Sequence, residues 1–145
     1  MAEVSDRPRI IRAIKKCLTD TYEYYQDAMD ILDSLGEGSM GVGMTPLIGG
    51  FAMKDPKDSY REALIKVDSA EKALLPLIKR FKDGRVNKSH FTDEEALILL
   101  KDIGEFDHQM LIDKLAEQKG RETVWYKLRE LSQKLKRVYK LVAEN

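Results

Sequence analysis

The sequence is poor in the residues that mark several large classes of protein. Cys17 is the one cysteine among 145 residues, so no disulfide can form within the chain. Basic and acidic residues number 25 each, which leaves no net charge to favour nucleic acid or an acidic membrane. The first residues show no secretory signal, and no apolar run is long enough to cross a membrane. We therefore expect a cytoplasmic protein of one domain, residues 1–145, with no cofactor.

Apolar residues recur at steps of three and four in four segments, which is the pattern of amphipathic helices. The four series lie at residues 11–35, 60–81, 96–115 and 124–142. Gly36, Gly84 and Gly120 follow the first three, and glycine commonly ends a helix. At Gly120 the apolar stripe shifts by roughly 70°, which favours a tight turn over one continuous helix that would require a dimer. Four helices of similar length predict an all-α fold, an antiparallel up-down-up-down four-helix bundle.

Several residues predict where the helices begin and how they bend. Ser5 or Asp6 can cap the first helix, and Asp55 before a proline can cap the second. Pro76 lies opposite the apolar stripe of the second helix, so it should bend that helix rather than end it. Thr92 stands three residues before a glutamate, the spacing of a capping box for the third helix.

The connection between the first two predicted helices, residues 36–53, is the least ordinary part of the sequence. It is rich in glycine and carries no charge from Gly38 onward. Connections between helices usually take about 2 to 8 residues, and disordered segments are usually charged. We therefore expect this stretch to pack, either as a lid on its own bundle or against a second subunit. Its apolar residues form the predicted partner interface: Met40, Val42, Met44, Leu47, Ile48, Phe51 and Met53.

The leading functional interpretation is therefore a non-enzymatic module that self-associates or binds a protein partner through residues 36–53. The last helix is basic and the second half of the first is acidic, so the two are expected to pair along a seam. A basic helix could instead contact the phosphates of a nucleic acid. No flanking lysine precedes the glycine-rich stretch, which disfavours insertion at a membrane surface.

The third segment carries polar residues whose helical phase can be compared with its apolar stripe. Glu105 and His108 have the ExxH spacing of di-metal bundles, but the phase turns Glu105 away from the core, so no metal site is predicted. The same phase places Asp107 in the middle of the apolar face. A buried carboxylate needs a partner, and the candidates are Tyr22, Tyr25, Tyr60, Trp125 or an inward-folding Lys or Arg. Without one, Asp107 would be a functional acid with a raised pKa.

The segment RVNKSH, Arg85 to His90, has an RxxxxH spacing. In this spacing it resembles the HEPN ribonucleases, which are also small helical bundles. The resemblance covers six residues and implies that Arg85 and His90 would hold and cleave an RNA backbone. The alternative for the same residues is a solvated turn. RNA cleavage or RNA binding is therefore the alternative function.

Overall fold

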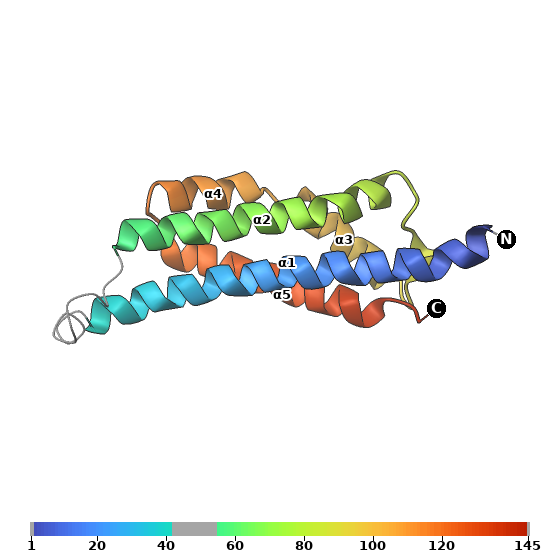
Figure 1. Cartoon of the computed structure of the whole chain (residues 1–145), viewed down its shortest axis with the longest axis horizontal. Helices are drawn as coiled ribbons and strands as arrows, with labels where there is room; N and C mark the ends of the chain where they lie inside the picture. The colour runs from blue at the N-terminus through green and yellow to red at the C-terminus, as the bar shows by residue number, and fades with distance from the viewer. Residues whose placement is uncertain (1, 42–54, 145) are drawn as a thin grey trace.

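The computed structural model describes the backbone of residues 2–41 and 55–144 and the side chains of residues 6–35 and 55–144 (Figure 1). Within these ranges the prediction of an all-helical chain is confirmed. The elements are α1 (Ala2–Gly41), α2 (Pro56–Lys82), a 3-10 helix η2 (Lys88–His90), α3 (Glu95–Glu105), α4 (His108–Ala116) and α5 (Arg121–Leu141). Among the described residues, none of these helices is both long and apolar enough to span a membrane.

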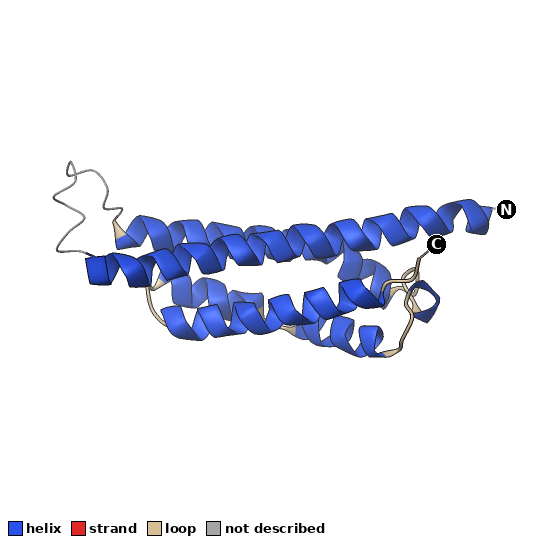
Figure 2. Ribbon diagram, turned by 90° about the horizontal axis from the view of Figure 1, so that it is seen from below, coloured by secondary structure: helices blue, strands red, loops and turns tan. Residues whose placement is uncertain are grey.

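The helices form two layers around one apolar core. Helices α1 and α2 lie side by side in one layer, and α5 lies with α3 and α4 in the other (Figure 2). Across the layers, α1 contacts α5 and α2 contacts α4. Both ends of the chain lie at the same end of the molecule (Figure 1). The predicted apolar stripes face the core, whose fully buried residues include Ile14, Leu18, Leu32, Val67, Leu77, Leu100, Leu111, Leu128 and Leu135.

Helix α2 begins and ends as the sequence predicts. The Asp55 side chain accepts a hydrogen bond from the backbone N–H of Lys57 at 2.9 Å, which caps the first turn. Pro76 lies within the helix and is exposed, on the side away from the core. The chain leaves the helix through Gly84, whose φ of +86° is a conformation that glycine adopts without strain.

Helix α1 is longer than the sequence suggests. It starts at Ala2, so neither Ser5 nor Asp6 caps it and Pro8 lies inside it. It also continues through Gly36 to Gly41, so the prediction that Gly36 ends the helix is wrong. A glycine ends a helix only when it takes the left-handed conformation, and otherwise lowers helix stability by about 1 kcal/mol.

The expected third helix is divided into α3 and α4, so the prediction of four helices is wrong in number. The break lies at Phe106 and Asp107, which have extended backbone with ψ of 134° and 90°. Neither proline nor glycine occupies these two positions, which is why the sequence pattern did not reveal the break. At Gly120 the expected tight turn is present, because φ is +66° there and α5 begins at the next residue.

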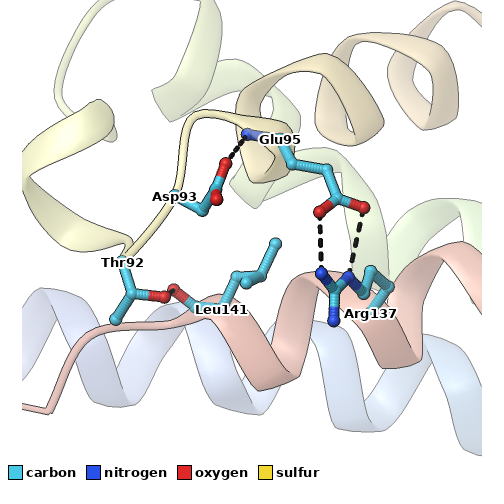
Figure 3. A network of polar contacts seen from close by, with 5 residues as sticks. All are labelled: Thr92, Asp93, Glu95, Arg137 and Leu141. Atoms are coloured by element: carbon cyan, nitrogen blue, oxygen red, sulfur yellow. Dashed lines mark hydrogen bonds and ion pairs between the residues drawn. The ribbon is translucent and has the colours of Figure 1, made fainter.

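A polar network ties the start of α3 to the end of α5 (Figure 3). The Thr92 hydroxyl donates to the carbonyl of Leu141 at 3.2 Å, and the Thr92 backbone N–H donates to the same oxygen at 2.7 Å. The predicted capping role of Thr92 is therefore wrong, and the Asp93 carboxylate instead accepts from the backbone N–H of Glu95 at 2.8 Å. Arg137 donates two hydrogen bonds, of 3.1 and 2.8 Å, to the Glu95 carboxylate. The guanidinium thereby lowers the pKa of Glu95.

Candidate functional site

An apolar groove lies on the surface where α1 meets α5. Its volume is about 490 Å³. Leu18 and Leu135 form its floor, and each is 1% exposed. Tyr22 on α1 is half-buried and Tyr139 on α5 is 43% exposed, so two aromatic rings stand along the groove. Each tyrosine follows a floor leucine by four residues, which places both on the same face of their helix.

Charged groups of both signs line the groove. Exposed Glu23 stands on the α1 wall, and exposed Lys136 and Lys140 stand on the α5 wall. The described side chains form no ion pair with any of these three groups. The ammonium of Lys15 lies 5.7 Å from the centre of the Tyr139 ring, at cation–π distance. The groove thus combines two partly exposed tyrosine rings with exposed charges of both signs.

The expected seam between acidic α1 and basic α5 is found only in part. The two helices are neighbours, as predicted. The ion pairs from α5 to another helix, as far as the described side chains go, lead to α3 and join Lys134 to Asp102 at 3.9 Å and Arg137 to Glu95 at 2.8 Å. The charges that line the groove are therefore not neutralised across the α1–α5 seam.

A buried polar cluster joins α1, α2 and α4 inside the molecule. The Tyr25 hydroxyl is hydrogen-bonded to Nε2 of His108, and Nδ1 of His108 lies 3.8 Å from a carboxylate oxygen of Glu71. Because a carboxylate can only accept, the hydrogen of the neutral ring is assigned to Nδ1, so Nε2 accepts from the Tyr25 hydroxyl. Burial raises the pKa of Tyr25 and lowers that of His108, against an opposing effect of Glu71 on the histidine. The cluster is thus a neutral, satisfied pair beside one half-exposed carboxylate.

Asp107 is not the buried acid that the sequence predicted. It is exposed at the start of α4, where the break after α3 changes the helical phase. The position inside the core belongs to His108, which is 4% exposed. Tyr25, one of the candidate partners of Asp107, binds His108 instead, and the buried indole N–H of Trp125, another candidate, has no hydrogen-bond partner among the described residues. The sequence prediction missed His108 because it treated α3 and α4 as one continuous helix. The break between them changes which residues face the core.

Arg85 and His90 lie at the same end of the molecule but line different pockets. Arg85 is exposed and held by Asp83 at 2.7 Å. His90 is buried, and its Nδ1 accepts from the backbone N–H of Asn87 at 3.2 Å. Burial, and then the nearby charge of Arg7, lower the pKa of His90. The His90 carbonyl accepts from the N–H of residue 143 at 2.8 Å, which fixes this turn to the end of the chain.

The residues of the predicted partner interface cannot be placed. Val42, Met44, Leu47, Ile48, Phe51 and Met53 lie outside the described residues. Met40 belongs to α1, but its side chain also lies outside the described set. The groove between α1 and α5 was not predicted. Its one sequence signal is the pair of tyrosines at the border of two apolar stripes, beside residues of opposite charge.

The described side chains include no group of three or more His, Cys, Asp or Glu placed to hold a metal ion. No protein-family model matches the chain, nor does any curated protein or solved structure compared with it. The functional argument therefore depends on the geometry of the chain itself. The groove between α1 and α5 places two tyrosine rings over a buried apolar floor, beside exposed charged groups of both signs.

Proposed function

We propose that the protein is a self-associating helical module, an interaction protein rather than an enzyme, whose copies meet through the groove between α1 and α5. The observation that carries this proposal is a groove in which Tyr22 and Tyr139 lie between Glu23 on α1 and the two lysines of α5, Lys136 and Lys140. Partly exposed tyrosine rings beside charged groups are a composition found in protein interfaces. Because the walls differ in sign, a second copy of the same surface is a complementary occupant.

A two-fold axis running along the groove would match these walls. Such an axis places α1 of one copy over α5 of the other and keeps every residue at its level along the groove. Glu23 of each copy then lies on the side of the interface where the other copy carries Lys136 and Lys140. Tyr22 and Tyr139 would be covered at the same time. Tyrosine is enriched in interface cores, where its ring is buried and its hydroxyl is bonded.

The size of this face is adequate for a dimer. Helix α5 has 21 residues, which is a length of about 31 Å at 1.5 Å per residue. Two adjacent helices, each roughly 10 Å wide, offer about 600 Å² of flat area, and side-chain relief adds to it. A standard interface buries roughly 800 Å² per partner. The α1–α5 face is therefore of the right order for a modest, reversible association.

Two further parts of the proposal come from the sequence. The contacts of α1 with α2 and α5, and of α2 with α4, support an antiparallel bundle in which α3 and α4 together take the third position. The glycine- and methionine-rich residues 36–53 would add a second contact between copies. RNA cleavage is not the function that we propose, because His90 is buried and the side chain of Arg85 is held by Asp83.

Charge reversal on each wall tests the proposed dimer. Glu23→Lys should place like charges opposite the lysines of the second copy, and the pair Lys136→Glu with Lys140→Glu should do the same with the sign reversed. Each variant should dimerise at least tenfold more weakly, because like charges across an interface are unfavourable. A 1:1 mixture of the two variants should recover a dimer, as should all three changes in one chain. Sedimentation velocity from 1 to 200 µM measures each case.

A matched reversal at the residue after α4, Glu117→Lys, controls for the change in net charge, since Glu117 is exposed and lies outside the groove. This variant should associate like the unchanged protein. A monomer at every concentration up to 200 µM would overturn the proposal. A dimer that ignores both reversals would exclude the groove and leave residues 36–53 as the surface to test.

A further inference from the structure

A second pocket, of about 330 Å³, lies between the first half of α1 and the last turns of α2. Its floor belongs to the core, because Ile14, Leu77 and Val86 are each 1% exposed. Its rim is formed by three arginines, Arg9, Arg80 and Arg85, together with Asp6. Small-molecule pockets have volumes of roughly 300 to 1,000 Å³ and combine an apolar lining with a few charged groups. This pocket meets both criteria.

The turn after α2 builds the rim next to the floor. The backbone N–H of Val86 donates to the carbonyl of Arg80 at 3.0 Å, which folds the chain back over the end of the helix. Gly84, with φ of +86°, permits that reversal. The Asp83 carboxylate accepts from the backbone N–H of Arg85 at 3.0 Å and from its guanidinium at 2.8 Å. The pocket is therefore held in shape by the backbone.

The three arginines are not equally engaged. Arg9 pairs with Asp6 at 3.3 Å, and Arg85 pairs with Asp83 at 2.7 Å. Arg80 is half-buried, and no described carboxylate pairs with it. Three guanidinium groups and two carboxylates leave one net positive charge at the rim. A guanidinium has five N–H donors in a planar fork that fits a carboxylate through two parallel hydrogen bonds.

We infer that this pocket binds a small apolar carboxylic acid, with the carboxylate on Arg80 and the apolar body on the floor formed by Ile14, Leu77 and Val86. The single net charge of the rim matches a monoanion rather than a phosphate dianion. The apolar floor favours a ligand with a hydrocarbon or aromatic body over a bare anion. Arg9 and Arg85 keep further N–H donors at the rim that can orient the carboxylate. The site is separate from the groove between α1 and α5 and does not depend on self-association.

Titration with octanoate, followed by two-dimensional NMR of the full chain, tests the inference. Octanoate should shift the signals of Ile14, Leu77 and Val86 saturably, with a dissociation constant on the order of 1 mM for a ligand of this size. Acetate lacks the apolar body and octanamide lacks the charge, so each should bind at least tenfold more weakly. Inorganic phosphate tests the bare dianion and should also bind at least tenfold more weakly than octanoate.

Arg80→Gln should weaken octanoate binding at least tenfold, and Arg80→Lys should weaken it less, because a lysine keeps the charge but not the fork. Lys79→Gln is the matched control, since Lys79 is the exposed neighbour on α2 outside the pocket, and it should bind octanoate normally. Unchanged amide spectra away from the pocket establish that the variants are folded. Absence of saturable shifts up to 10 mM octanoate would overturn the inference. So would equal binding of octanamide, tighter binding of phosphate, or undiminished affinity in Arg80→Gln.

Discussion

Tyr25 and His108 form a buried hydrogen bond that joins α1 to α4, two helices far apart in the sequence. The Tyr25 ring is 0% exposed and His108 is 4% exposed, so water does not satisfy either group. The two rings are nearly parallel, with an interplanar angle of 15°. Phe106 packs edge-on against the histidine from the break between α3 and α4, with ring centroids 5.2 Å apart. The polar pair therefore fixes where α4 begins relative to α1.

Replacing Tyr25 with phenylalanine should destabilise the fold by about 1–3 kcal/mol, because Nε2 of His108 would stay buried without its donor. The aromatic ring and its packing remain, so the loss reports on the hydroxyl. Urea unfolding followed by circular dichroism measures it. Tyr126→Phe is the control and should change stability by less than about 0.5 kcal/mol, because Tyr126 is 62% exposed. Equal effects of the two substitutions would contradict the assigned role of the buried hydroxyl.

The free energy of unfolding should depend on pH because the two buried histidines, His90 and His108, have lowered pKa values in the folded state. Burial lowers the pKa of His108, and burial followed by the charge of Arg7 lowers that of His90. Below about pH 6.5 the unfolded chain therefore binds protons that the folded chain does not. Stability should be complete above this pH and should fall as the pH drops from 6.5 through the lower folded-state values. NMR titration should give both rings a pKa below 6.5, and a value above it for His108 would contradict this account.

The location of the helices followed from the sequence because it depends on local spacing. The apolar stripe from Tyr60 to Phe81 lies on the core side of α2, and Pro76 lies opposite it. Gly84 and Gly120 end segments because both have positive φ, whereas Gly36 lies inside α1. The sequence alone does not distinguish these cases. Whether a glycine ends a helix depends on the hydrogen bonds and packing of the residues that follow it.

The candidate sites depend on packing between distant segments, and this limited what the sequence could reveal. The break at Phe106 changed the phase, so the prediction placed Asp107 in the core where the structure has His108. The groove lies where the half-buried and exposed rings of Tyr22 and Tyr139 stand above the buried Leu18 and Leu135. The spacing of apolar residues predicts which side of a helix faces the core. It does not predict where the packing of two helices leaves a groove on the surface.

Removal of residues 142–145 should destabilise the protein by about 2–3 kcal/mol. Val142 is 5% exposed and forms an isolated antiparallel bridge with Phe91, while the N–H of Ala143 donates to the carbonyl of His90 at 2.8 Å. Burial of a valine contributes roughly 1.5–2 kcal/mol, and one backbone hydrogen bond about 1 kcal/mol. Removing only residues 144–145 is the control and should have little effect. A shortened chain that keeps full stability would show that these contacts do not anchor the turn at His90.

Replacing Gly84 or Gly120 with alanine should lower the free energy of unfolding by about 1–2 kcal/mol in each case. The reason is that both residues have positive φ, at +86° and +66°. An added Cβ at Gly84 meets no atom within 4 Å, so its cost is purely conformational. At Gly120 the Cβ would lie 3.2 Å from Cδ of Lys114, a flexible side chain that can move, so the two costs should agree within about 0.5 kcal/mol. Asparagine tolerates the left-handed region better than alanine and should recover part of the loss at both positions. Thermal and urea unfolding of the four variants measures this, and a neutral alanine at either position would mean that the turn can adopt another conformation.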